Sequence, residues 1–157
     1  MEYGGRSHTE HNLVWLGIVL AVGLLLAFVL YTFWPNTLGM SVSVGAKTFY
    51  ADIAENEADR TTGLSTFDKL TDDKALLMVY QDDAVWPVET KDATSAVDIL
   101  WISKEKRIVY IARDARPSAR ATYKPGGNSR YVLMLPAGSV AKYGITAGQQ
   151  VSFEHEV

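Results

Sequence analysis

The chain has 157 residues, of which 48% are hydrophobic, and its formal net charge is −3. That length accommodates one domain of ordinary size plus an additional segment. The small negative charge argues against a nucleic-acid partner, which would require a basic surface. Because the sequence contains no cysteine, disulfides, thiol nucleophiles and cysteine-ligated metal sites are excluded.

The first predicted element is a transmembrane helix over residues 13–34, preceded by a short N-terminal tail over residues 1–12. The run is free of charged residues, and as a helix rising about 1.5 Å per residue it would match a hydrocarbon core of roughly 30 Å. Trp15 and Trp34 stand near its ends, where aromatic side chains favour the headgroup region. A cleaved signal peptide is the alternative, but its apolar region would be only about 7–15 residues long, and residues 33–36 make a poor cleavage site.

The charges beside this helix predict its orientation. Arg6 and the α-amino group lie on the N-terminal side, whereas no lysine or arginine follows the helix until Lys47. By the positive-inside rule, the N-terminus then lies in the cytoplasm. The sequence therefore predicts a single-pass protein of the cell membrane, held in the lipid bilayer through residues 13–34, with its C-terminal domain outside the cytoplasm.

Residues 35–46 are predicted to form a linker and a first strand, and residues 47–157 a compact β domain. Short apolar runs alternate there with turn residues, which is typical of small β proteins. Residues 75–80 are apolar throughout, as in a strand buried on both faces. We therefore predict a mainly β fold, a compact β-sandwich or barrel with one or two short helices. The other expected strands cover residues 47–54, 96–103, 107–113, 130–135 and 150–154.

Two short helices are expected within the domain. Asn56 can cap the first through its side chain, and Gly63 is predicted to end it. The second covers residues 139–143 and ends at Gly144. The segment over residues 114–129, which is rich in glycine and proline, is predicted to be a long loop that is either functional or mobile.

Charge is unevenly distributed along the domain. Residues 52–98 carry twelve acids and four bases, whereas residues 104–142 carry nine bases and two acids. One interpretation is that the two halves neutralise each other across strand pairs. The other is a site for an anionic ligand or an acidic protein partner on the long loop. Its basic side chains would be Arg113, Arg116, Arg120, Lys124 and Arg130.

The sequence offers few groups for catalysis, cofactors or metals. His155 lies close to the C-terminus, and His8 and His11 lie in the N-terminal tail, where a solvated role is the ordinary one. GxSxG, Walker and dinucleotide-type glycine motifs are all missing. Neither a Ser-His-Asp site, nor a cofactor, nor a metal site is therefore predicted.

Asp98 is the most informative acidic residue, because it stands in the apolar run of residues 96–102. A carboxylate in such surroundings needs a cation or hydrogen-bond donors, or else it takes up a proton. Lys91 and Arg60 are the candidate partners. A structural ion pair is the common outcome for such a group, and a ligand-binding or catalytic carboxylate is the alternative.

Several sequence blocks resemble the family called domain of unknown function 192. The similarity covers about residues 49–153 and implies a compact, mainly β sandwich or barrel that is often exported or membrane-anchored. The family has no agreed activity. The blocks are Arg60–Leu64, Lys91 followed by Val97–Ile102, Arg130–Gly138, and Gly144-Ile145 with Gly148.

The chain departs from the pattern of this family at several positions. Ser65 and Phe67 stand where methionine and arginine are usual, Asp92 replaces an asparagine, and Ser95-Ala96 replaces an Ile-Pro pair. The leading expectation is a membrane-tethered extracytoplasmic module for binding or assembly, without catalysis of its own. The alternatives are a small hydrolase or lyase that uses Asp98 and Lys91, and a purely structural subunit of an envelope complex.

Overall fold

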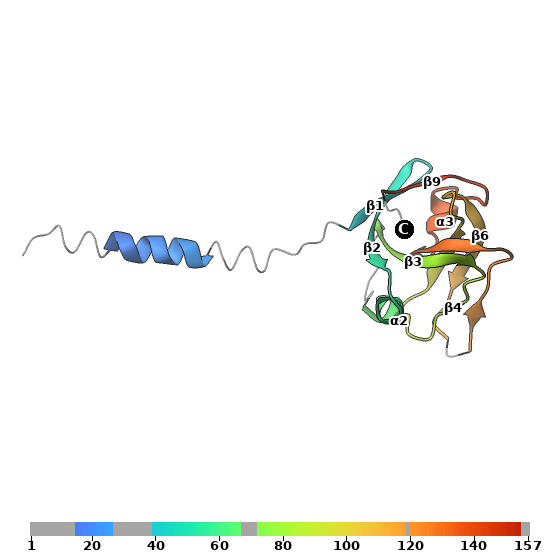
Figure 1. Cartoon of the computed structure of the whole chain (residues 1–157), viewed down its shortest axis with the longest axis horizontal. Coiled ribbons are helices and arrows are strands. Elements are labelled where there is room, and N and C mark those ends of the chain that lie inside the picture. The colour runs from blue at the N-terminus through green and yellow to red at the C-terminus, as the bar shows by residue number, and fades with distance from the viewer. Residues whose placement is uncertain (1–14, 27–38, 67–71, 119, 155–157) are drawn as a thin grey trace, which may run out of the picture. The chain divides into compact units, whose positions relative to one another are not determined.

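The computed structural model describes residues 15–26, 39–66, 72–118 and 120–154 (Figure 1). The chain divides into two compact units, Met1–Thr37 and Leu38–Val157. In the first unit, residues 15–26 form a helix whose large apolar side chains are exposed. The rest of the predicted transmembrane segment and the tail lie outside the described residues. No helix in the described ranges is both long enough and apolar enough to cross a membrane.

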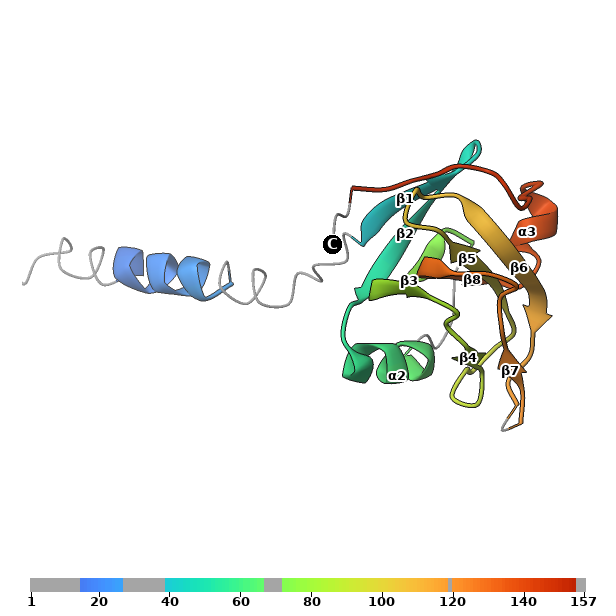
Figure 2. The same cartoon turned by 45° about the vertical axis from the view of Figure 1, so that its right-hand side comes forward.

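The second unit is built on one seven-stranded sheet that curls into a half-barrel (Figure 2). Neighbouring strands are antiparallel, except that β2 and β3 run parallel and are connected through α2 (Glu57–Thr66). A short helix, α3 (Ser139–Lys142), follows β8. The strand order is β6 (Ile108–Ala115), β5 (Val97–Ile102), β8 (Ser129–Pro136), β3 (Lys74–Ala84), β2 (Lys47–Ala54), β1 (Met40–Val44) and β9 (Val151–Ser152).

The two outermost strands of the curled sheet meet at one end. The amide of Ile108 donates to the carbonyl of Gln149 at 3.0 Å, and the amide of Val151 donates to the carbonyl of Lys106 at 2.8 Å. A separate two-stranded ribbon pairs β4 (Val88–Glu89) with β7 (Thr122–Tyr123). The prediction of a mainly β fold with short helices is therefore confirmed. Of the two predicted architectures, sandwich and barrel, the barrel is closer to the structure, because the seven-stranded sheet curls on itself instead of packing against a second large sheet.

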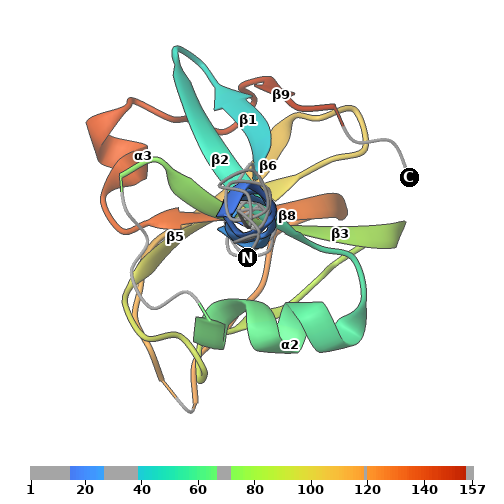
Figure 3. The same cartoon turned by 90° about the vertical axis from the view of Figure 1, so that its left-hand side faces the viewer.

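Each face of the curled sheet carries its own hydrophobic cluster. In β3, Ala75, Leu77 and Val79 belong to the first cluster, whereas Leu76 and Met78 belong to the second. The prediction that this apolar run is buried on both faces is thus confirmed. The first cluster packs against α3, and the second lies on the side of α2 and the β4–β7 ribbon, away from α3 (Figures 2 and 3).

The helix signals in the sequence were partly correct. The side chain of Asn56 accepts a hydrogen bond from the amide of Asp59 at 2.8 Å, as expected for a cap. Gly144, with a φ of 62°, follows α3 as predicted. The prediction that Gly63 ends the first helix was wrong, because the helix continues to Thr66, where the hydroxyl of Ser65 adds a hydrogen bond to the preceding turn.

The segment over residues 114–129 is not one long loop. Strand β6 extends to Ala115, and β7 occupies part of the remainder. The physical reason is that Tyr123 pairs with Val88 and packs against the second cluster. Apolar burial therefore fixes the middle of a segment whose glycines and prolines favoured a loop.

Candidate functional site

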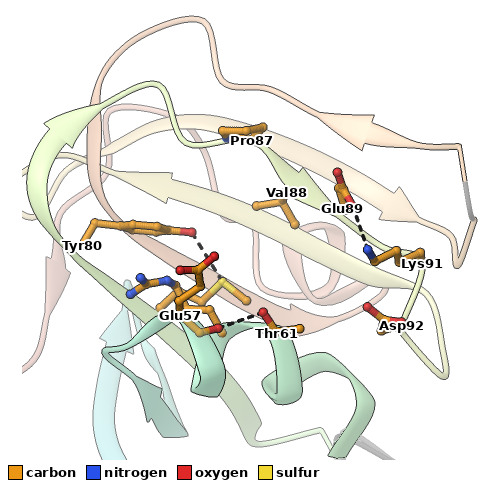
Figure 4. Close-up of a pocket in the computed structure, with 10 residues that line it drawn as sticks. Glu57, Thr61, Tyr80, Pro87, Val88, Glu89, Lys91 and Asp92 are labelled. Carbon is orange, nitrogen blue, oxygen red and sulfur yellow. Dashed lines mark hydrogen bonds and ion pairs between the residues drawn. The ribbon is translucent and has the colours of Figure 1, made fainter.

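A pocket of about 320 Å³ opens on the side of the domain that carries α2. Three segments surround it, as Figure 4 shows: α2, β3, and the chain that enters and leaves β4. From α2 come Glu57, Arg60 and Thr61; from β3 come Met78 and Tyr80; Pro87, Val88, Glu89, Lys91 and Asp92 complete the lining.

Arg60 fixes the α2 wall of the pocket to the sheet. Its Nη1 atom donates hydrogen bonds to the carbonyl oxygens of Glu55, at 2.5 Å, and Val79, at 2.9 Å. Its guanidinium carbon lies 4.7 Å from the centre of the Tyr80 ring, within the range of a cation–π interaction. Arg60 therefore acts as a brace between α2 and β3.

Tyr80 belongs to an aromatic stack at the edge of the pocket. The Trp86 ring lies nearly parallel to it, at 13° and 4.1 Å between ring centres. The Trp86 carbonyl accepts a hydrogen bond of 2.8 Å from the indole of buried Trp101, which anchors the stack to β5. Burial raises the pKa of the Tyr80 hydroxyl above its usual range, and the charge of Arg60 offsets part of that increase.

At high pH, Tyr80→Phe is expected to keep stability that the parent protein loses when Tyr80 ionises. Because burial raises the folded-state pKa of Tyr80, its stabilising contribution is complete below the unfolded value of about 10 and disappears as pH rises through the folded value. At pH 7 the variant loses only a weak O–H···S contact to Met78, so its stability should stay within about 0.5 kcal/mol. Thermal melts of both proteins between pH 7 and 11 measure the difference, in which the other tyrosines cancel. A constant difference across this range would contradict the assignment.

The opposite wall of the pocket is held by the β7 segment. Val88 and Glu89 pair with Tyr123 and Thr122. Fully buried Thr90 donates its hydroxyl to the carbonyl of Arg116 at 2.8 Å. This pocket wall and residues 116–123 are therefore parts of one structural unit.

The charged groups of this opposite wall are accessible to solvent. The ammonium of Lys91 lies 3.4 Å from a carboxylate oxygen of Glu89, and both side chains are about half exposed. Such a pair contributes little to stability, on the order of 0–1 kcal/mol. Lys91 and Asp92 are thus available to a ligand that enters the pocket.

Asp98 is buried, but it does not contribute to this pocket. One carboxylate oxygen accepts a hydrogen bond of 2.9 Å from the amide of Asp114, and the other accepts one of 2.8 Å from the amide of Val140. The expected pairing with Lys91 or Arg60 is therefore wrong. The reason is the strand alternation, which places Asp98 on the same face as Leu100 and Val140 of the first cluster.

The charge asymmetry of the sequence is partly neutralised within the domain. Asp83 lies 3.3 Å from the guanidinium of Arg130 and 3.9 Å from the ammonium of Lys104, and Asp72 pairs with Lys142. The hydrogen-bonded ammonium of Lys142 lowers the pKa of the Asp72 carboxyl. These contacts link the acidic and the basic halves, as the first interpretation of the charge pattern expects.

The remaining basic residues lie together in the sequence. Arg116 holds the carboxylate of Asp114 through two of its nitrogens. Arg113, Arg120 and Lys124 are exposed, and among the described residues their side chains form no ion pair. We call residues 113–124 the basic segment.

The structure brings some of the predicted site residues together and separates others. Arg60 and Lys91 line the pocket, whereas Asp98 and the basic segment do not. Glu57 was missed, although its position three residues before Arg60 places both on one helix face. Tyr80 and Val88 were missed because nothing in the sequence shows that β3 and β4 face α2. Within the described ranges, no group of three or more potential metal-binding side chains converges.

The same fold occurs in crystal structures of other proteins, among them the following two. One is a protein of unknown function from Novosphingobium aromaticivorans DSM 12444, with 22% identity, a TM-score of 0.69, and coverage of 75% of this chain and 89% of that one. The other is a proposed transcription regulator from Sinorhizobium meliloti 1021, with 20% identity, a TM-score of 0.67, and coverage of 73% and 91%. At these identities the likeness concerns the fold alone.

The family of the chain follows from its sequence. No curated protein matches it. The model of the DUF192 family, described as "Uncharacterized ACR", matches residues 40–153, which include all strands of the curled sheet and the whole pocket. The chain therefore belongs to the DUF192 family.

Proposed function

We propose that the chain is a membrane-tethered binding module, which holds a small polar ligand in the pocket between α2 and β4 and catalyses no reaction of its own. The observation that carries the proposal is the convergence of charged side chains from two separate segments, α2 and residues 87–92, on one pocket. Its volume of about 320 Å³ lies at the lower end of the range for small-molecule sites, which is about 300–1,000 Å³.

The tether rests on the N-terminal segment. The large apolar side chains of residues 15–26 are exposed in the structure, and the sequence continues without a charge to Trp34. A contiguous apolar surface of this kind needs an apolar environment or a partner protein to cover it. The whole charge-free run over residues 13–34, continued as a helix, would match the thickness of a bilayer. With the domain outside the cytoplasm, the tether would keep the pocket at a high effective concentration near other membrane components.

The non-catalytic reading rests on the position of Asp98. A hydrolase or lyase that uses Asp98 with Lys91 needs both groups at one reaction centre. The two oxygens of Asp98 are instead engaged by backbone amides, whereas Lys91 lies at the pocket. Acid–base chemistry shared between these two residues is therefore not supported.

The basic segment supports a second candidate, a docking surface for an anionic ligand or an acidic protein, as in a structural subunit of an envelope complex. Arg113, Arg120 and Lys124 are exposed cations without a carboxylate partner among the described residues. Charge complementarity of this kind accelerates association and selects the partner.

A thermal-shift screen of the full-length chain against a set of small polar molecules tests the proposal. Binders are expected, and their stabilisation should be lost in Lys91→Ala because that substitution removes a charge from the pocket wall. Lys104→Ala is the matched control: Lys104 is also an exposed lysine beside a carboxylate, but it lies outside the pocket.

Each variant assigns a binder to one surface. Loss of stabilisation in Lys91→Ala but not in Lys104→Ala supports the pocket. Loss confined to Lys124→Ala assigns the binder to the basic segment and contradicts the pocket. Turnover of any binder would contradict the non-catalytic reading.

A further inference from the structure

We infer that the pocket takes a small zwitterion of amino-acid or dipeptide size, with its cationic group directed to Glu57 and its anionic group directed to Lys91. The inference rests on the proposed function and names the chemical class of its ligand. It follows from the distribution of charge over the two walls of the pocket and from the apolar surface between them.

Glu57 provides an acceptor for a cation on the α2 wall. Its carboxylate has no ion-pair partner within the described residues, although Arg60 lies on the same helix. Arg60 is engaged by two backbone carbonyls and by the Tyr80 ring. Arg60 therefore stabilises the fold, and the carboxylate of Glu57 remains available to a cationic group of a ligand in the pocket.

Lys91 provides a cation on the opposite wall. Its only ion-pair partner in the described part of the chain is Glu89, at 3.4 Å, with both side chains about half exposed. Ion pairs between exposed side chains are weak, so a ligand carboxylate can bind the Lys91 ammonium without breaking a stable contact.

Apolar surface separates these two charged groups. Figure 4 shows Val88 between Glu57 on one side and Lys91 on the other. Val88 and Met78 are only 3% and 4% exposed, and both line the pocket. An aliphatic portion between the two charges of a ligand would contact them.

The balance of charge favours a zwitterion over a simple ion. The lining contains the three acids Glu57, Glu89 and Asp92 and the two bases Arg60 and Lys91. A ligand with negative charge alone would face repulsion from Glu57 and Asp92, and one with positive charge alone would face Lys91. A ligand that carries both charges satisfies both walls.

The test measures binding of L-alanyl-L-alanine to the isotope-labelled full-length chain by NMR, with two blocked forms of the same dipeptide. The acetylated form keeps only the carboxylate, and the amidated form keeps only the ammonium. The free dipeptide is expected to shift the amide signals of Thr61, Val88 and Lys91. Each blocked form should bind about tenfold more weakly, because it lacks one charge-assisted hydrogen bond.

Two variants test the role of each wall. Glu57→Gln and Lys91→Met should each weaken binding of the free dipeptide by about tenfold. Asp82→Asn is the control, because Asp82 is exposed and lies outside the pocket, and its affinity should equal that of the parent chain.

The outcomes separate this inference from the proposed function. A blocked dipeptide that binds as tightly as the free one overturns the zwitterion. So does the absence of any dipeptide binding when another small molecule shifts the pocket signals, and in both cases the pocket remains a binding site. If none of the dipeptides and none of the small molecules shifts a pocket signal, both the inference and the proposed function are contradicted.

Discussion

Replacing Asp98 by alanine is expected to lower the free energy of unfolding of the domain by about 3–5 kcal/mol. The carboxylate is 1% exposed and accepts hydrogen bonds from the amides of Asp114 and Val140. Alanine would leave the buried amide of Val140 and the partly buried amide of Asp114 without this acceptor, and a buried, unsatisfied amide costs about 1–3 kcal/mol. The substitution would also remove the two hydrogen bonds through which Asp98 joins β5 to α3 and to the end of β6.

Two further variants distinguish this role from a general effect of removing an acid. Asp98→Asn keeps one acceptor oxygen but places an amide donor opposite the second N–H group, so its stability should lie between those of the parent and Asp98→Ala. Asp82→Ala removes an exposed carboxylate and should change stability by no more than about 0.5 kcal/mol. Chemical denaturation with unchanged m-values gives all three numbers. Equal stability of Asp98→Ala and Asp82→Ala would refute the structural role.

Burial of Asp98 could be predicted from the sequence, but its partners could not. Burial follows from the apolar residues on both sides of Asp98, which stay buried whichever way the strand faces. The partners come from backbone amides that lie 16 and 42 residues further along the chain. Every residue except proline has a backbone amide, so no sequence pattern marks these two. The charged side chains that the sequence predicted as partners, Lys91 and Arg60, line the pocket between α2 and β4 instead.

Most strands could be predicted for a similar reason. Continuous apolar runs such as β3 carry a strong local signal, because each residue contributes to one of two clusters. Strand β4 gave no such signal, since it contains only Val88 and Glu89. One wall of the pocket depends on this short strand and on its pairing with β7, so the site could be anticipated only in fragments, through Arg60 and Lys91.

A chain that begins at Gly39 is expected to fold cooperatively and to remain entirely in the soluble fraction, whereas the full-length chain should be recovered with membranes. Every residue of the two hydrophobic clusters lies between Met40 and Phe153, so the shortened chain keeps both. Gly39 itself should be kept, because a Cβ atom there would lie 2.9 Å from the carbonyl oxygen of Ala51. Cell fractionation and a denaturation curve of the shortened chain measure the two effects.

A matched full-length variant separates the tether from chain length. Leu20→Arg combined with Leu24→Arg places two charges near the centre of the predicted transmembrane segment, at a cost of about 2.5–3.5 kcal/mol each. This variant should lose membrane association while its domain melts as the parent domain does. Protease added to intact cells that carry the unmodified chain should digest the domain, because the positive-inside rule places it outside the cytoplasm. Membrane association that survives both the truncation and the arginine pair would contradict the tether, and digestion only after lysis would reverse the orientation. An unfolded chain from Gly39 onward would mean that the domain depends on the N-terminal segment for its stability, because both of its own clusters are still present.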